Sequence, residues 1–203
     1  RGVDGGVIQP ERPLTGMHET DVLIVGGGAA GFAAAVASAR AGAKTALVER
    51  YGYLGGLWTG GLVLKVYPTH ATENGARTKV VCGVGDELLG RVARHANGAT
   101  NYAEGKPDPT TDPEITKVVM DEMIGEAGVK MFFHCWVADA VMDGNAVRGV
   151  VIESKAGRQA ILAQVVVDAS GDGDVFAAAG AEYEQRLHAV GLVHRLGNVD
   201  RAD

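Results

Sequence analysis

The sequence has few of the features that mark several classes of protein. Cys82 and Cys135 are its only cysteines, and they form neither a C-x-x-C pair nor a cluster with metal-ligand spacing. Two reduced thiols without a disulfide framework are compatible with a cytoplasmic protein. No apolar run approaches the roughly 18 residues that a membrane helix needs. The net charge is −6 and basic residues form no stripe, so nucleic acid is not an expected partner.

Glycine, by contrast, is abundant. The 203 residues include 30 glycines, well above the usual share of about 7%. They gather in turns rather than in a repeat, which is typical of an α/β protein with many tight loops. Apolar residues make up 46% of the chain, enough for a sizeable core in one domain or one and a half.

The most informative glycines follow a short apolar stretch at 22–25 that predicts a strand. Gly26, Gly28 and Gly31 have the spacing G-x-G-x-x-G, and an Ala-rich helix follows at once. Gly26 allows the tight turn, Gly28 leaves room for a pyrophosphate, and Gly31 lets the helix lie close to the strand. The free N–H groups of the first helical turn, which contains Ala29 and Ala30, would hold the phosphate charge with the help of the helix dipole.

A second predicted strand at 45–48 ends in Glu49, about 20 residues beyond the glycines. A carboxylate at that position can accept hydrogen bonds from an adenosine ribose, and it would repel a 2′-phosphate, which argues against NADP. Strand, helix and acidic strand end together predict a dinucleotide site. The alternative is a strand–helix–strand unit with a tight glycine turn and no ligand.

The rest of the chain predicts further elements of an α/β fold. Five glycines within 52–61 favour a loop, and an apolar pattern within 78–97 indicates a helix. Asp112 and Pro113 are a helix start, and Gly128 is its stop. Strands are expected at 129–133, 136–142, 146–153 and 160–166, the last three as a β-meander, then a short helix at 174–179, and further strands at 182–184 and 191–196.

Three segments together go beyond a generic dinucleotide fold. They are residues 21–49, Leu54-Gly55-Gly56, and the run Val167-Asp-Ala-Ser-Gly-Asp-Gly-Asp174. The combination closely resembles FAD-dependent oxidoreductases of the glutathione-reductase-like class, which are distantly related to the fumarate reductase and succinate dehydrogenase flavoproteins. The resemblance covers roughly residues 20–62 and 129–197, and it implies a Rossmann-like FAD-binding domain with a parallel sheet and a β-meander.

The resemblance also implies roles for individual residues. The first glycines would hold the FAD pyrophosphate, and Glu49 would bind the adenosine ribose. Further cofactor contacts are implied, in chain order, for Arg50 beside the adenine–ribose half, Gly55 and Gly56 along the pyrophosphate and ribityl chain, Leu57 and Thr59 towards the flavin, Val137 through its backbone at the adenine, and the turn residues Ala169, Ser170, Gly171 and Asp172. For Trp58, core packing competes with flavin-side contact, and for Asp168 and Asp172 turn and cap chemistry competes with cofactor contact.

The function that follows from this resemblance is FAD-dependent oxidation or reduction of a small-molecule substrate by hydride or two-electron transfer. The lack of a C-x-x-C pair argues against a disulfide reductase, and no pattern identifies a catalytic residue. A non-catalytic dinucleotide-binding subunit of a larger complex remains an alternative. So does an NAD-dependent dehydrogenase, although such a domain needs neither Gly55-Gly56 nor the turn at 168–174.

Flavoproteins of this class also carry a late FAD-binding segment, which the residues after Asp174 do not supply. We therefore expect this chain to be the N-terminal portion of an enzyme, completed by a second polypeptide or by the C-terminal part of the same protein. The expected organisation is an irregular arm at 1–18, the FAD-binding domain at 19–62 and 112–182, an inserted helical and loop segment at 63–111, and the incomplete start of a substrate domain at 183–203.

Overall fold

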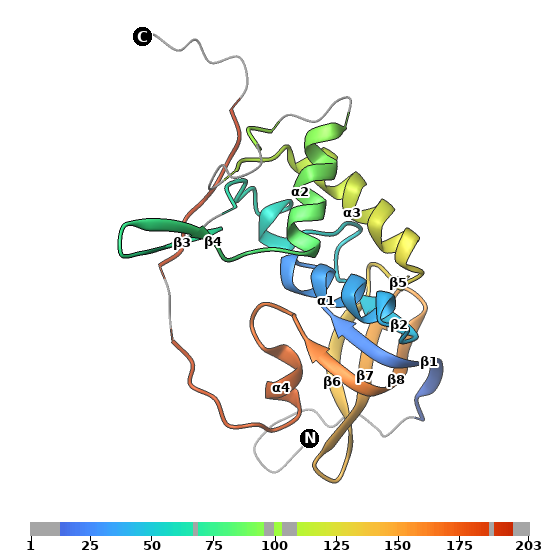
Figure 1. Cartoon of the computed structure of the whole chain (residues 1–203). Helices are drawn as coiled ribbons and strands as arrows, with labels where there is room; N and C mark the ends of the chain where they lie inside the picture. The colour runs from blue at the N-terminus through green and yellow to red at the C-terminus, as the bar shows by residue number, and fades with distance from the viewer. Residues whose placement is uncertain (1–12, 67–68, 96–99, 103–108, 187–188, 197–203) are drawn as a thin grey trace.

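A six-stranded sheet forms the centre of the protein (Figure 1). The computed structural model describes residues 13–66, 69–95, 100–102, 109–186 and 189–196. The strand order is β5-β2-β1-β8-β7-β6. The strands of this sheet are β1 (Thr15–Val25), β2 (Thr45–Val48), β5 (Lys130–Phe132), β6 (Trp136–Asp143), β7 (Ala146–Ser154) and β8 (Gly157–Asp168). The helices are α1 (Ala29–Arg40), α2 (Val84–Arg94), α3 (Pro113–Ala127) and α4 (Asp174–Ala178), with a short 3₁₀ helix at Gly56–Trp58.

The sheet has a parallel half and an antiparallel half that share one strand. β5, β2, β1 and β8 are parallel, and α1 connects β1 to β2 in a strand–helix–strand unit. β8, β7 and β6 form an antiparallel meander. The long strand β8 belongs to both halves, because residues before Ala163 pair with β7 and residues up to Asp168 continue along β1. The predicted α/β class, with a Rossmann-like parallel sheet and a β-meander, is confirmed.

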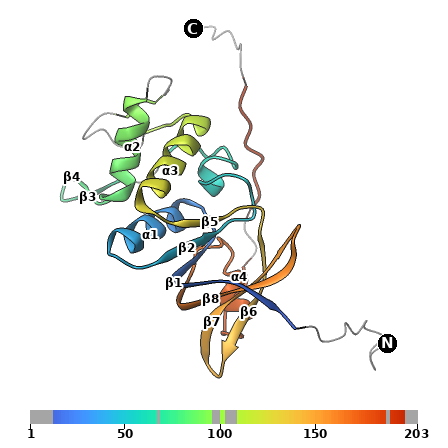
Figure 2. The same cartoon turned by 90° about the vertical axis from the view of Figure 1, so that its right-hand side faces the viewer.

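Both faces of the parallel strands are covered, which explains why β1 ends in an uninterrupted apolar run. On one face Ile24 packs with the three long helices; its buried partners there include Phe32, Leu47, Leu88, Val92, Met120 and Met123. On the other face Leu23 and Val25 pack against the meander; the buried meander residues there include Val150, Ile152, Ile161 and Ala163. Figure 2 shows α1, α2 and α3 together on one side of the parallel strands, with the meander strands β6, β7 and β8 below them.

The helix α3 begins and ends as its sequence predicts. The Asp112 carboxylate accepts hydrogen bonds from the backbone N–H groups of Glu114 and Ile115, at 2.9 and 3.1 Å, and Pro113 is the first helical residue. Gly128, with φ of 73°, ends the helix in the left-handed conformation that glycine adopts without strain. None of the described helices is long and apolar enough to cross a membrane.

The structure differs from the sequence-based expectation at several element boundaries. The irregular arm predicted through residue 18 is wrong from Thr15 onwards, because β1 begins there and pairs with the meander end of β8. Residues 1–14 otherwise lie mostly outside the described part. The helix expected within 78–97 begins only at Val84, and no strand forms at 182–184 or 191–196 within the described residues.

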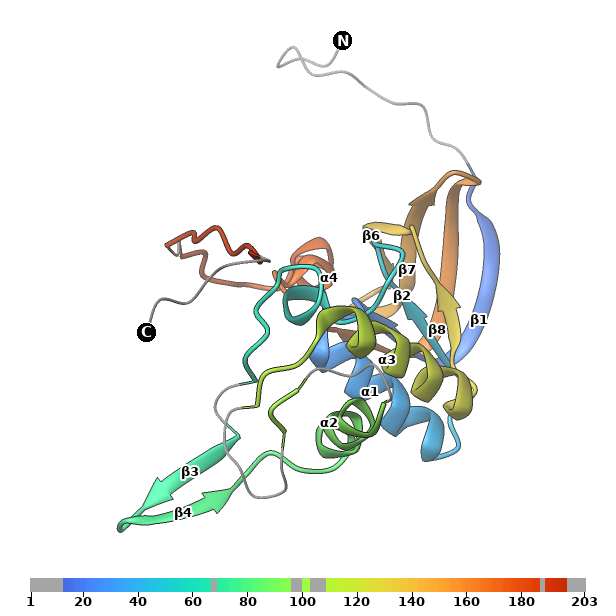
Figure 3. The same cartoon turned by 90° about the horizontal axis from the view of Figure 1, so that it is seen from above.

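A hairpin of β3 (His70–Glu73) and β4 (Ala76–Lys79) was not predicted. Its short strands lack the apolar alternation that signals a half-buried strand, and nearly every residue in it is exposed. Asn74 and Gly75 form its turn with positive φ of 50° and 81°, as two-residue hairpins require. Figure 3 shows the hairpin projecting away from the helices.

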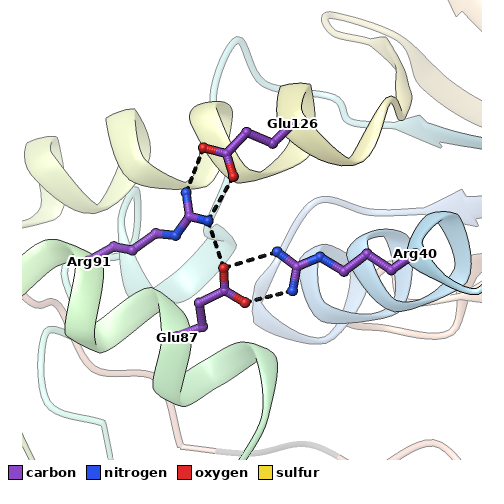
Figure 4. Close-up of polar contacts among 4 residues, drawn as sticks. All are labelled: Arg40, Glu87, Arg91 and Glu126. Carbon is purple, nitrogen blue, oxygen red and sulfur yellow. Dashed lines mark hydrogen bonds and ion pairs between the residues drawn. The ribbon is translucent and has the colours of Figure 1, made fainter.

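Four charged side chains join the three long helices (Figure 4). The Arg40 guanidinium on α1 donates to both carboxylate oxygens of Glu87 on α2, at 2.6 and 3.0 Å. Arg91, one turn further along α2, donates to Glu87 and to both oxygens of Glu126 on α3, each at 2.7 Å. Since α2 also buries apolar side chains in the helix-side core, this part of the expected insertion at 63–111 is packed into the dinucleotide fold.

Candidate dinucleotide site

The first glycine loop lies at the carboxyl end of β1. The Gly26 N–H donates to the carbonyl of Val48 at 2.8 Å, which fixes the loop to β2. Gly26 has φ of +96°, and a methyl group there would collide with the carbonyl of Ala169. A methyl group at Gly31 would collide with the carbonyl of Gly26. The first and last glycines of the motif are therefore required by the fold itself.

Gly28 differs from its two companions because it faces open space. Its backbone is extended, with φ of −65° and ψ of −175°, which any residue can adopt. A methyl group at Gly28 would meet only the Cα of Gly56, at 4.0 Å. Gly28 is the N-cap of α1 and has no side chain to cap it, while Ala29 and Ala30 in the first turn are exposed. The first N–H groups of a helix have no partner within the helix, so this end is a ready anion site.

A second glycine loop lies against the first. The Gly55 N–H donates to the carbonyl of Gly27 at 2.8 Å, and Gly55 forms a parallel bridge with Gly28. Gly55 and Gly56 have positive φ of 108° and 54°. A methyl group at Gly56 would come within 3.0 Å of the Gly28 Cα. The two loops, from separate parts of the sequence, thus form one continuous backbone surface beside the start of α1.

Glu49 is buried behind this surface. Its Oε2 accepts a hydrogen bond of 2.6 Å from the Gly27 N–H, and its Oε1 accepts one of 2.8 Å from the Tyr51 N–H. Only 6% of the residue is exposed. Each carboxylate oxygen has capacity for a further hydrogen bond, so the side chain can brace the loop and still accept from a ribose hydroxyl. The sequence predicted the ribose contact but not the bracing role.

A pocket opens at the carboxyl ends of β1 and β2, where the meander approaches them. It is lined by Val25, Gly26, Val48, Glu49, Arg50, Cys135, Trp136, Val137, Ser170 and Asp174. Five of these residues were predicted as cofactor contacts, and the fold brings them together although they lie on β6 and on the three loops that follow β1, β2 and β8. Trp136 was missed, although it directly precedes Val137 in the sequence. The only feature of the sequence that could have pointed to Trp136 is the position of a large aromatic residue next to a predicted cofactor contact.

The turn after β8 is held by its own side chains. Asp168 Oδ1 accepts from the N–H and hydroxyl of Ser170, at 3.1 and 2.6 Å, and Oδ2 accepts from the N–H groups of Val175 and Phe176. The Ser170 hydroxyl oxygen accepts in turn from the N–H groups of Gly173 and Asp174. Burial alone would raise the pKa of Asp168, but these hydrogen bonds outweigh it and hold the pKa below its ordinary value.

The remaining predicted contacts lie outside the pocket lining. The Thr59 side chain is buried and its hydroxyl donates to the Leu54 carbonyl at 2.6 Å. Leu57 is 76% exposed. The Trp58 ring packs against the helix-side core, and its Nε1 donates to the Thr111 hydroxyl at 2.8 Å, so core packing accounts for this residue. Ala169 lies behind Gly26, where its N–H donates to the Val25 carbonyl; Gly171 and Asp172 are exposed on the turn.

The fold and this site define a protein with a dinucleotide-binding fold of the flavoprotein type. The parallel sheet, the meander and the glycine loops are the parts of that fold. The family model described as FAD dependent oxidoreductase matches residues 21–191. The chain therefore belongs to the FAD-dependent oxidoreductase family, which confirms the resemblance seen in the sequence.

This chain spans only part of the length of the individual proteins that it resembles. Thiamine thiazole synthase from Methanococcus vannielii is 32% identical over 163 residues, which are 75% of this chain and 56% of that protein. The crystal structure of THI4 from Thermovibrio ammonificans superposes with a TM-score of 0.55 at 26% identity, over 79% of this chain and 61% of that one. An open conformation of a flavocytochrome c3 fumarate reductase gives a TM-score of 0.50 at 18% identity, over 75% of this chain and 34% of that one, and shows the fold alone.

Proposed function

We propose that this chain binds FAD through its two glycine loops and forms the cofactor-binding portion of an FAD-dependent oxidoreductase acting on a small molecule. The observation that carries the proposal is the contact between the loops at Gly28 and Gly55–Gly56, beside the uncapped start of α1. A backbone surface without side chains lets a pyrophosphate approach, and the helix end favours its negative charge.

The roles of the residues follow from their positions. The first-turn N–H groups of α1 hold the pyrophosphate, and the Glu49 carboxylate accepts from the adenosine ribose while it braces Gly27. Gly55 and Gly56 lead from the pyrophosphate towards Leu57, which lies exposed at the exit of the loop. When bound, FAD supplies the hydride or two-electron chemistry.

The proposal also includes further residues, outside this chain, that complete the binding site around the flavin ring. The chain spans 56% of the length of the Methanococcus vannielii relative. We propose that a C-terminal part of the same protein, or a second polypeptide, closes over the flavin and contributes the substrate site. Mixing the chain with such a part should raise the affinity for FAD more than the affinity for ADP, because only FAD reaches the flavin end.

A second candidate is the formation of the thiazole of thiamine. The support is the 32% identity to a thiamine thiazole synthase across 75% of this chain. The two candidates separate by readout, because an oxidoreductase bleaches its bound flavin when a reducing substrate is added, whereas a thiazole synthase releases a thiazole that mass spectrometry identifies.

The cofactor itself is tested by releasing the nucleotide from the purified chain, identifying it by mass spectrometry, and measuring the binding of FAD, NAD and ADP by calorimetry. We expect FAD to be found and to bind more tightly than NAD. Binding of NAD alone would favour a dehydrogenase. Binding of FAD that is no tighter than the binding of ADP would favour a non-catalytic subunit. Absence of any nucleotide binding would refute the proposal.

Gly28→Ala is the sharpest variant for this test. The added methyl group has room in the fold, so any loss of FAD binding comes from the space that the pyrophosphate needs. We expect binding to fall by about tenfold or more, since misplacing one phosphate contact costs about 1.4 kcal/mol or more. Gly125→Ala on α3, where a methyl group meets nothing within 4 Å, is the matched control and should bind FAD normally.

A further inference from the structure

An aromatic side chain that the dinucleotide motif does not include lies at the rim of the pocket. Trp136 begins β6 and lines the pocket with Glu49, Arg50 and Val137. Trp136 is 57% exposed, although its indole ring is large and mostly apolar. One surface of this ring is therefore available to a flat ligand that enters the pocket.

The ring is held in place by a stacked cation. The Arg50 guanidinium carbon lies 5.4 Å from the centroid of the Trp136 ring and 5.0 Å from the centroid of the Tyr51 ring. The Tyr51 ring stacks in turn on that of Tyr53, with centroids 5.5 Å apart and planes 6° from parallel. Arg50, Tyr51 and Tyr53, on the loop between β2 and the second glycine loop, thus connect through successive ring and cation contacts to Trp136 on β6. Such packing fixes the orientation of long side chains before a ligand arrives.

Backbone groups at the same place are available for hydrogen bonds. β6 is the outermost strand of the sheet, so the groups on its outer side point away from β7. The register of β6 against β7 shifts between Val137 and Asp139, directly beside Trp136. An aromatic face and the edge of an irregular strand are thus presented side by side.

We propose that Trp136, ordered by Arg50, is the stacking platform for the adenine base of the bound dinucleotide. The proposal rests on the proposed function, because it assumes that the pyrophosphate lies at α1. Glu49, which would accept from the ribose, lines the same pocket, so the attached base reaches the indole. Aromatic rings and guanidinium planes are the surfaces on which nucleobases stack.

ADP is the probe for this test, because it carries the base, ribose and diphosphate but no flavin. In Trp136→Leu the Kd for ADP should rise by about tenfold, since stacking on an aromatic ring is worth about 1–3 kcal/mol per base. Trp136→Phe keeps an aromatic face and should restore most of the affinity. The chain has two tryptophans, so ADP should quench fluorescence in the wild type and leave the Trp58 emission of Trp136→Phe unchanged.

Tyr183→Leu is the matched control. Tyr183 is 58% exposed, like Trp136, but does not line the pocket, so this variant should bind ADP as the wild type does. Thermal unfolding of each variant without ADP separates lost binding from lost folding. Equal ADP affinity in Trp136→Leu and wild type would overturn the platform while leaving the FAD proposal intact. A wild type that binds neither ADP nor FAD would overturn both.

Discussion

The Glu49 carboxylate accepts a hydrogen bond of 2.6 Å from the backbone N–H of Gly27. The residue predicted to bind a ribose therefore also supports the loop that would hold the pyrophosphate. The second oxygen accepts from the Tyr51 N–H, so one side chain fixes the starts of both loop segments that leave β1 and β2. Nucleotide binding and loop stability are coupled through this carboxylate.

Glu49→Gln should therefore destabilise the protein even without a ligand. An amide offers one acceptor oxygen and one donor nitrogen, whereas Gly27 and Tyr51 both present N–H donors. One buried N–H loses its acceptor, which costs about 1–3 kcal/mol of the free energy of unfolding. Urea denaturation of the variant measures this loss. Glu19→Gln, at an exposed position of β1, is the control, and equal midpoints for Glu49→Gln and wild type would contradict the bracing role.

Gly31→Ala should unfold the protein more easily, in contrast to Gly28→Ala. A methyl group at Gly31 would overlap the Gly26 carbonyl oxygen, which belongs to the backbone and cannot rotate out of the way as a side chain could. Overpacking of this kind costs about 1–3 kcal/mol. The thermal midpoint should fall for Gly31→Ala and stay near the wild-type value for Gly28→Ala. If both variants melted alike, the division between packing glycines and an open ligand glycine would be mistaken.

The sequence was sufficient to predict the core of this fold and five of the ten residues that line the pocket. The strand–glycine–helix pattern and the acidic end of β2 depend on local chemistry, so Gly26 and Glu49 could be placed without coordinates. The meander was also predictable, because the glycine-containing pairs Asp143-Gly144 and Ala156-Gly157 separate its strands.

Contacts between distant segments were harder to predict. The Thr15 end of β1 forms a strand only because β8 extends far enough to pair with it, and no local pattern signals that. Trp136 becomes a pocket residue because the meander brings β6 to the carboxyl end of β2. The hairpin β3–β4 escaped prediction since its polar residues lack periodicity.

Asp168→Ala should loosen the turn that backs the first glycine loop. The carboxylate accepts from Ser170 and from two N–H groups at the start of α4, and all of these lose their acceptor in the variant. Loss of such a cap costs about 0.5–2 kcal/mol. Chemical denaturation should show the decrease. Asp172→Ala, at an exposed position in the same turn, is the comparison, and an equal effect of both changes would contradict a cap role for Asp168.

The four charged side chains that join α1, α2 and α3, namely Arg40, Glu87, Arg91 and Glu126, should make the stability of the protein depend on pH under acidic conditions. The hydrogen bond from Arg40, followed by that from Arg91, lowers the pKa of Glu87 from 4.5 to about 2. A carboxyl group with a lower pKa in the folded state stabilises the fold fully above the unfolded pKa. That contribution is lost progressively as the pH falls from about 4.5 through about 2, where Glu87 becomes half protonated in the folded state as well.

Glu87→Gln removes this titration and should flatten the acid side of the stability curve. Its free energy of unfolding should lie below that of the wild type near pH 7 and approach it as the pH falls towards about 2. Urea denaturation across this range measures both curves. Glu73→Gln in the exposed hairpin is the control, and its curve should run parallel to that of the wild type. Parallel curves for Glu87→Gln and the wild type would mean that Arg40, Arg91 and Glu126 hold the three helices together without help from the Glu87 charge.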